Sequence, residues 1–354
     1  MWVCRTSAKT SQGCISGGIA ASINRAVISI AVIFWIALPM RAQSGLDDVH
    51  IQPRVATAPT RGEFAGISDL ISHSPIKVNV DLVLVPVTIT DGMNRLVQGL
   101  EKDNFQVFEG KRPQQIRYFS KEDGPVSLGI ILDLSGSMKA KLERAKDAVL
   151  DFLNHANPQD EFFLITFSDQ PEEAADFTQR IEDIESRLAF VFPKGRTALL
   201  DAIYLGMSKM RQARYKRKAL LIISDGGDNH SRYTEHEVVS LVKEADVMIY
   251  AIGVYSSYFP TQEEYLGPQL LHEVSQVTGG KDFTIDNAND LADATRSVGV
   301  MLRNQYLIGY HPAETRKDGK WHKIKVLLKR PLKPKSVGGA FRVYAKAGYY
   351  APTQ

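Results

Sequence analysis

The alternation of apolar, strand-like segments with helix-like segments from Val126 to about residue 303 constrains the fold of this chain most strongly. The segment VSLGIILDL begins this stretch and is apolar throughout, as expected of a strand whose two faces are both covered. FFLITF, KALLIISDG and VMIYAIGV repeat that pattern, and KDFTI is a shorter strand. The alternation predicts an α/β fold with a doubly wound, mostly parallel sheet and helices on both of its sides.

Helical periodicity separates these strands, with apolar residues spaced three or four positions apart. It predicts helices over 139–154, from Thr197 onward, near 269–277 and near 290–304. A further helix is predicted where Thr234 and Glu237 have the spacing of a capping box. Residues 126–303 are therefore predicted to form one α/β domain.

Residues 76–125 and 304–354, which flank this domain, have a β pattern instead. VNVDLVLVPVTIT predicts a strand, and Pro86 within it indicates an edge or a bulge because proline has no amide donor. FQVFEGKRPQQIRYF predicts two further strands, YLIGY and HKIKVLL predict a hairpin around Asp318-Gly319, and FRVYAKAGYY predicts one last strand. Because short β pieces are rarely stable alone, we expect the two flanking segments to pair into a small β-sandwich-like unit.

Residues 1–42 have the layout of a secretory signal, in which basic residues precede an apolar run. The run Ala26–Leu38 has 13 uncharged residues, whereas a membrane span needs about 20. A cleaved signal is therefore predicted, with an uncleaved N-terminal anchor as the alternative. Either one indicates export to the periplasm, the cell envelope or the medium, and only the anchor would contact a membrane. Residues 43–75 are polar, contain three prolines and predict a linker.

The charge balance excludes a nucleic-acid-binding surface. The chain has 43 basic and 40 acidic residues, but four of the basic residues and none of the acidic ones lie in residues 1–42. The remaining 39 basic and 40 acidic residues leave the exported part nearly neutral. PKGRTALL lacks the spacing of a phosphate-binding loop, so no nucleotide is expected. Cys4 and Cys14 both lie in the leader, so no disulfide is expected in the exported part.

Five oxygen-bearing residues stand at predicted strand ends or at a predicted helix start: Asp133, Ser135, Ser137, Thr197 and Asp225. Ligands of an open parallel sheet bind in the crevice beyond the carboxyl ends of its strands, so these residues can converge. Two carboxylates and three hydroxyls suit a hard cation such as Mg²⁺, which prefers six oxygen ligands. The absence of Cys and His from the set argues against zinc and copper.

The order Asp-x-Ser-x-Ser, then Thr, then Asp closely resembles the metal-ion-dependent adhesion site of the von Willebrand factor A (VWA) domain family. ILDLSGSM, GRTALLDA and ISDGGDN carry the resemblance, which covers about residues 126–303. It implies that Ser135 and Ser137 bind the metal directly and that Thr197 does so directly or through water. It implies that Asp133 and Asp225 act mostly through water or hydrogen bonds. The implied cofactor is Mg²⁺, with Mn²⁺ or Ca²⁺ open, and the implied partner is a protein that offers an Asp or Glu carboxylate to the metal.

The flanks resemble an exported bacterial group of VWA-related proteins. The segments VDLVLVPVTITD, DNFQVFEGKRPQQIRYFS and PVSLGIILDLSGSM and the terminal YLIGYHP and GYYAP carry this narrower resemblance. This narrower resemblance covers nearly all of the exported part and implies little about the ligand. Together with the five site residues it leads us to expect metal-dependent protein recognition or adhesion outside the cytoplasm. The cluster has no base or nucleophile with an orienting partner, so catalysis is not expected.

Other interpretations of the same residues stay open. Asp133 and Asp225 could cap helices, Thr197 could be only an N-cap, and Asp228 and Asn229 are interpreted as turn residues. The flanking β unit could act as a structural or assembly module of the cell envelope, with the metal incidental. An accessory role beside an ATPase, as VWA domains have in metal-chelatase complexes, disagrees with the exported leader.

Overall fold

The computed structural model describes most of the compact unit Pro75–Gln354. The described residues are 82–121, 123–255, 262–313, 318–329 and 340–353. The predicted signal or anchor and the predicted linker lie outside the described residues. Within the described part, no helix is long and apolar enough to cross a membrane.

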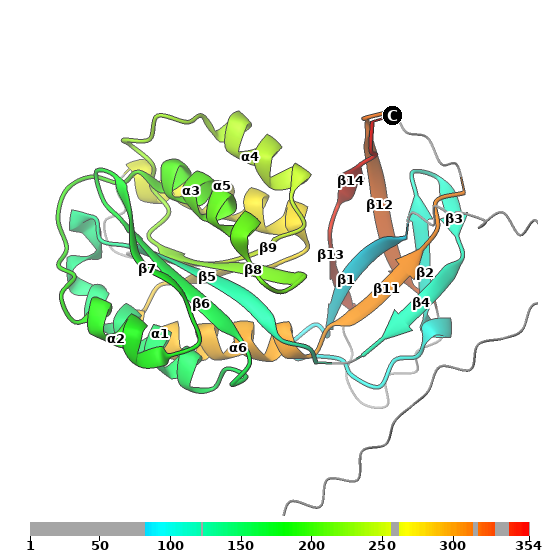
Figure 1. Ribbon diagram of the computed structural model, residues 1–354, viewed down its shortest axis with the longest axis horizontal. Coiled ribbons are helices and arrows are strands. Elements are labelled where there is room, and N and C mark those ends of the chain that lie inside the picture. Colours follow the sequence, from blue (N-terminus) through cyan, green and yellow to red (C-terminus); the bar gives the residue numbers. More distant parts are fainter. Residues whose placement is uncertain (1–81, 122, 256–261, 314–317, 330–339, 354) are drawn as a thin grey trace, which may run out of the picture. The chain divides into compact units, whose positions relative to one another are not determined.

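A six-stranded sheet forms the centre of the α/β domain, in the order β10-β9-β8-β5-β6-β7 (Figure 1). Its strands are β5 (Val126–Asp133), β6 (Glu161–Phe167), β7 (Pro171–Thr178), β8 (Arg217–Ser224), β9 (Met248–Val254) and β10 (Asp282–Ile285). Neighbouring strands run parallel except β6 and β7, which are antiparallel. The predicted mostly parallel sheet is confirmed, and the largely polar edge strand β7 is an addition to it.

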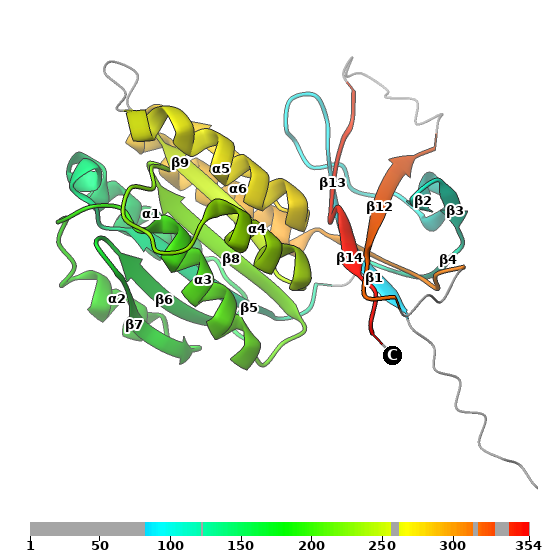
Figure 2. The same ribbon diagram turned by 90° about the horizontal axis from the view of Figure 1, so that it is seen from above.

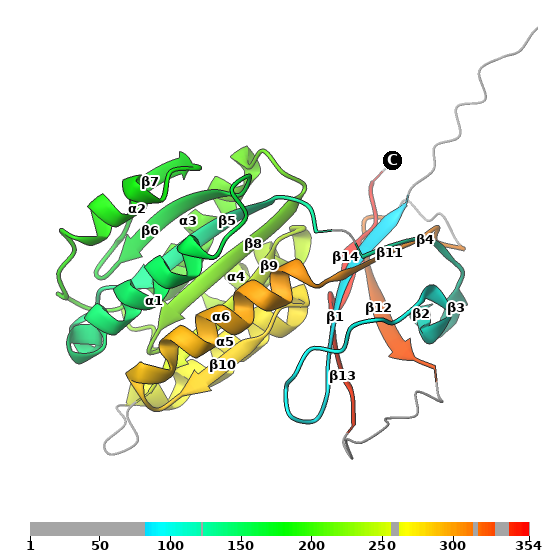
Figure 3. The ribbon, with the colours of Figure 1, turned by 90° about the horizontal axis from the view of Figure 1, so that it is seen from below.

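Helices cover both faces of this sheet (Figures 2 and 3). One face carries α1 (Leu142–Asn154), α2 (Ile181–Leu188) and α6 (Leu291–Arg303), and the other carries α3 (Leu199–Lys209), α4 (Glu235–Glu244) and α5 (Gln262–Thr278). Along β5, Ile130 and Leu132 belong to the core under α1 and α6, whereas Ile131 belongs to the core under α3 and α4. This division follows from the alternation of side chains along a strand. The sequence pattern did not predict α2.

Two four-stranded antiparallel sheets are built from the flanking segments, in the orders β13-β1-β11-β4 and β14-β12-β2-β3. The N-terminal segment supplies β1 (Val83–Thr90), β2 (Phe105–Glu109), β3 (Arg112–Gln114) and β4 (Ile116–Ser120). The C-terminal segment supplies β11 (Tyr306–Tyr310), β12 (Trp321–Leu328), β13 (Arg342–Ala345) and β14 (Gly348–Tyr350). Each sheet therefore mixes strands from both sides of the α/β domain, and one hydrophobic cluster contains side chains of both sheets.

Two strand predictions for the C-terminal segment are wrong. β11 and β12 form no hairpin around Asp318-Gly319, because β11 pairs with β1 and β4 while β12 pairs with β2 and β14. FRVYAKAGYY is divided between β13 and β14, which lie in different sheets. Pro86 lies in a part of β1 that pairs with β11 only, since the pairing with β13 begins at Val87. A residue without an amide donor is tolerated in such a locally one-sided position.

Candidate metal centre

Asp133 and Asp225 lie at the ends of two adjacent parallel strands. β6 lies on one side of β5, and β8 and β9 lie on the other, so the chain changes its direction of travel across the sheet between β5 and β8. Asp133 is the last residue of β5, and Asp225 follows the last residue of β8. The paired register of Leu132 with Ile223 places the two carboxylates at the same edge. Crevices at such switch points are the usual ligand sites of open α/β sheets.

Both oxygens of the Asp133 carboxylate are engaged. Oδ1 accepts a hydrogen bond from the Ser135 amide at 2.7 Å, and Oδ2 accepts one from the Ser224 hydroxyl at 2.6 Å. Burial and, second to it, the nearby charge of Asp225 raise the pKa of Asp133 to about 7. Asp225 itself is only 2% exposed. Two buried carboxylates this close together call for a positive charge between or beside them.

Ser135 and Ser137 form a hydroxyl pair beside these carboxylates. Their Oγ atoms are 3.0 Å apart, with Ser135 buried and Ser137 exposed. The chain turns there through a short 3-10 helix, Gly136–Ala140, before α1 begins. The hydrogen bond that Asp133 accepts from the Ser135 amide therefore lies in a turn before α1. Asp133 does not cap an α-helix, as the alternative interpretation had it.

Thr197 is buried and is held by the loop that follows Asp225. Its amide donates to Oδ1 of Asn229 at 3.0 Å, and its carbonyl accepts from the Asn229 amide at 3.0 Å. The N-cap of α3 is Ala198, whose own side chain makes no capping hydrogen bond. The alternative interpretation of Thr197 as the N-cap is therefore wrong, whereas Asn229 has a positioning role that the turn interpretation did not include.

The segment before Thr197 is hydrogen-bonded to the loop after β5. The Lys194 amide donates to the Leu134 carbonyl at 2.7 Å, and the Gly136 amide donates to the Gly195 carbonyl at 3.1 Å. Together with the bonds between Thr197 and Asn229, these contacts join three loops at one edge of the sheet. The structure thus brings the five predicted residues to the same edge from three distant parts of the sequence.

Lys141 is a part of this site that no sequence pattern indicated. Its Nζ donates to the Val254 carbonyl at the end of β9 at 2.8 Å and lies 3.4 Å from Oδ2 of Asp225. The side chains of Lys141 and Asp225 are only 13% and 3% exposed. The ammonium therefore supplies part of the positive charge that the buried carboxylates need.

Two further residues shape the loop after β8. Oδ2 of Asp228 accepts from the Leu200 amide at 2.9 Å, so this carboxylate binds the start of α3. Gly226 has φ +80°, and a Cβ atom there would lie 2.7 Å from the Tyr255 hydroxyl and 2.9 Å from Cα of Gly267. A glycine is therefore required directly after Asp225, both by the backbone conformation and by the close contacts.

The donor set fits a hard cation that takes few protein ligands. Within the described part of the chain, no three His, Cys, Asp or Glu side chains come together as a possible metal cage. The centre instead has two carboxylates and three hydroxyls, all oxygen donors. Mg²⁺ typically keeps several waters and takes one or two carboxylates, which agrees with such a set.

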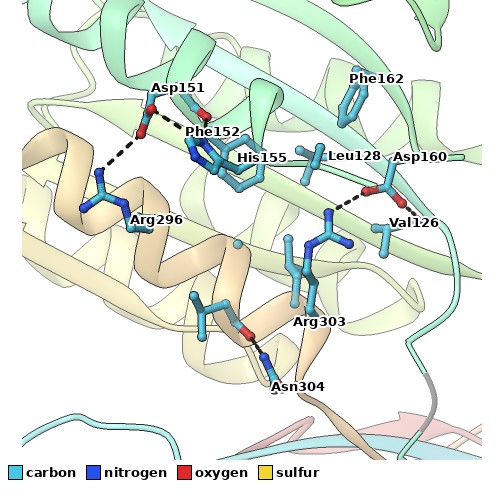
Figure 4. A pocket seen from close by; sticks show the side chains of 14 residues that line it. Val126, Leu128, Asp151, Phe152, His155, Asp160, Phe162, Arg296, Arg303 and Asn304 are labelled. Carbon is cyan, nitrogen blue, oxygen red and sulfur yellow. Dashed lines mark hydrogen bonds and ion pairs between the residues drawn. The ribbon is translucent and has the colours of Figure 1, made fainter. Parts of the chain in front are cut away.

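A cavity of the α/β domain lies at the opposite end of β5, next to Val126 (Figure 4). It has a volume of about 320 Å³ and lies between α1, α6 and the sheet. Its arginines are ion-paired: Arg296 with Asp151 at 3.5 Å, and Arg303 with Asp160 at 3.2 Å. The eight residues of β5, from Val126 to Asp133, span roughly 23 Å, so the cavity is separate from the candidate metal centre.

Residues 128–227 match the sequence model of the von Willebrand factor type A domain. Over these residues the chain is similar to VWA domains. The match contains all five predicted site residues. The VWA-like α/β fold, with helices on both faces of a mixed sheet, agrees with this assignment, and VWA domains generally mediate protein–protein interactions.

Two curated proteins are similar to the chain. An uncharacterized protein of Borreliella burgdorferi is 23% identical over 182 residues, which are 45% of this chain and 53% of that protein. The magnesium-chelatase 67 kDa subunit of Chlorobaculum tepidum is 27% identical over 195 residues, which are 51% of this chain and 31% of that subunit. The chain thus spans about half of the first relative and less than a third of the second. Among solved structures, a von Willebrand factor type A protein from Catenulispora acidiphila has a TM-score of 0.46 at 11% identity, covering 77% of this chain and 75% of that one.

Proposed function

We propose that Asp133, Ser135, Ser137, Thr197 and Asp225 hold one divalent cation, and that the cation binds a carboxylate of a protein partner. The observation that carries the proposal is the pair of buried carboxylates at adjacent strand ends, beside a hydroxyl pair that opens to the surface. Mg²⁺ is the proposed ion because every donor is an oxygen, and Mn²⁺ and Ca²⁺ are the alternatives. The cation would offer the partner's carboxylate a positively charged coordination position, while the five residues of the chain hold the cation in place.

The proposed function is recognition or adhesion, without catalysis, by a protein exported to the periplasm, the envelope or the medium. The residues of the centre are carboxylates, hydroxyls and one ammonium, a set that suits a bound cation. The cation would in turn attract an anionic group of the partner. Export rests on the apolar run Ala26–Leu38 and the basic residues before it. In the alternative proposal, the two antiparallel sheets dock to an envelope complex and the metal is incidental.

Thermal unfolding of the purified chain in EDTA and in excess Mg²⁺ or Mn²⁺ tests the metal site. A ligand at about 100 times its Kd stabilises the folded state by about 2.7 kcal/mol, which should raise the melting midpoint by roughly 5–10 °C. We expect Asp225→Ala to abolish the rise while the variant still unfolds cooperatively. Asp293→Ala, which removes an exposed carboxylate on α6, is the matched control and should keep the full rise.

The outcome decides between the two proposals. If the wild-type midpoint does not rise and calorimetric titration shows no metal binding, the VWA domain of this chain is a scaffold without a metal. Partner binding that persists in EDTA would then favour docking through the antiparallel sheets.

A further inference from the structure

The segment Ala189–Arg196, which lies between α2 and α3 (Figure 1), contains two phenylalanines that are exposed to solvent. Phe190 is 79% exposed and Phe192 is 69% exposed, more than any other large apolar side chain of the described residues. A single apolar residue on a surface needs no explanation. Two aromatic rings at alternate positions of one loop are a different case, because exposed aromatics are typical of the centres of protein interfaces.

This segment is fixed against the candidate metal centre. The hydrogen bonds of Lys194 and Gly195 to the loop after β5 lie only two and three residues beyond Phe192. The Arg196 amide also donates to Oδ1 of Asp169 at 2.9 Å. Gly195 has φ +73°, and a Cβ atom there would lie 2.5 Å from Oδ2 of Asp169, so the close approach requires glycine. The two rings are therefore presented next to the metal-binding loops by a backbone that those loops hold in place.

The charges around the segment favour an acidic occupant. Lys194 and Arg196 are its charged residues, and both are exposed. Lys139, in the turn after the Asp-x-Ser-x-Ser motif, is exposed as well. The nearby carboxylate of Asp169 accepts from the Arg196 amide and opposes part of this positive charge. A bound cation would add to the positive potential of this edge.

We propose that the aromatic–basic segment Ala189–Arg196 and the metal centre form one binding face for a protein segment that carries an Asp or Glu next to an apolar side chain. The acidic group reaches the cation and the surrounding basic side chains, while the apolar side chain packs on Phe190 and Phe192. This inference rests on the proposed metal-dependent function and adds to it the chemistry of the partner.

A library of random dodecapeptides displayed on phage is the probe. It is panned on the immobilised full chain in Mg²⁺ and eluted with EDTA. We expect the enriched peptides to combine an Asp or Glu with an apolar residue within a few positions. A synthetic peptide of an enriched sequence should bind the double variant Phe190→Ser/Phe192→Ser at least tenfold more weakly than the wild type. Met93→Ser, which removes an exposed apolar residue from the turn after β1, should leave the affinity unchanged.

Several results would overturn the proposal: recovery of no Mg²⁺-dependent peptides, enrichment of acidic peptides without an apolar residue, or equal affinity for the wild type and the double variant. If the wild type self-associates and the double variant does not, the two phenylalanines bind a second copy of this chain instead. Calorimetric titration with Mg²⁺ separates this proposal from the preceding one, because the double variant should bind the metal like the wild type. Peptides that bind in EDTA, and that need Phe190 and Phe192 to do so, would support the aromatic binding surface but contradict its dependence on the metal.

Discussion

At the scale of single residues, Lys141 determines how much negative charge a cation would meet at Asp225. The ammonium lies 3.4 Å from Oδ2 of Asp225 and is anchored by the Val254 carbonyl. It brings one positive charge into a site where two carboxylates are buried. A divalent cation at the same site would be repelled by that charge, and the repulsion is strengthened by the low exposure of the groups.

We therefore expect Lys141→Met to bind Mg²⁺ or Mn²⁺ more tightly than the wild type. The gain should be about tenfold, which corresponds to about 1.4 kcal/mol. The metal-free variant should be less stable than the wild type, because Asp225 loses its ion pair. Calorimetric titration measures the affinity, with Lys141→Arg as the control that keeps the charge. Equal affinities for the methionine and arginine variants would show that the charge of Lys141 does not act on the metal.

The sequence allowed the ligand candidates at this site to be predicted, but not the residues that support them. Asp133 and Asp225 follow long apolar strands, so their place at a sheet edge is encoded locally. Lys141 has no such signal, because its partner Asp225 is 84 residues away and the contact exists only in the folded sheet. The same holds for Asn229, whose short-range sequence context predicts a turn but whose side chain holds Thr197.

At the scale of secondary-structure elements, the start of α4 is specified by a reciprocal pair of hydrogen bonds. The Glu237 amide donates to the Thr234 hydroxyl at 3.3 Å, and the Thr234 amide donates to the Glu237 carboxylate at 2.8 Å. The hydrogen bonds from the Thr234 amide and hydroxyl hold the pKa of Glu237 below its usual value. The predicted capping box is confirmed, because its residues are only three positions apart.

Thr234→Ala should lower the free energy of unfolding by about 1 kcal/mol, since it leaves the first-turn amide of Glu237 without its hydroxyl acceptor. For a chain of this size the melting midpoint should fall by roughly 2–4 °C. Thr234→Ser keeps the hydroxyl and should retain most of the stability in the same thermal unfolding experiment. A serine variant as unstable as the alanine variant would assign the effect to the lost methyl group instead of the cap.

Elements that depend on distant partners were harder to predict. The polar sequence PEEAADFT forms the edge strand β7, where only one neighbouring strand and little apolar cover are needed. The predicted hairpin of β11 and β12 failed for a related reason. Both strands alternate correctly, but three of their four partners, β1, β4 and β2, lie about 200 residues upstream. The fourth partner is β14, which pairs with β12. Strand pairing of this kind depends on complementary faces across the molecule and has no local turn signal.

At the scale of the whole molecule, one carboxylate ties the N-terminal β segment to the C-terminal one. Glu109 in β2 accepts from the Tyr310 hydroxyl at 2.9 Å and from the Tyr349 hydroxyl at 3.3 Å. Its other oxygen lies 2.8 Å from Nδ1 of His322 in β12. The side chains of Glu109 and His322 are only 12% and 14% exposed. The two segments, separated in sequence by the whole α/β domain, are thus joined by a largely buried polar cluster as well as by a shared apolar core.

This cluster should make the stability of the β unit depend on pH. The hydrogen bond to Glu109 raises the pKa of His322 above its ordinary value, and Asp318 acts in the same direction. A histidine whose pKa is raised on folding stabilises the folded state fully below the unfolded value of about 6.5 and loses that contribution as the pH rises through the folded value. The free energy of unfolding should therefore decline as the pH increases above about 6.5.

His322→Gln removes the titration but keeps a donor for Glu109, so we expect it to flatten this decline. At pH 6 it should be less stable than the wild type by an amount on the order of 1 kcal/mol, as for a charge-assisted hydrogen bond. The difference should shrink at higher pH. Denaturant unfolding at a series of pH values measures the effect, and His236→Gln, which replaces an exposed histidine in α4, is the matched control. A difference between wild type and His322→Gln that stays constant across the pH range would mean that His322 packs between Glu109 and Asp318 without carrying a proton.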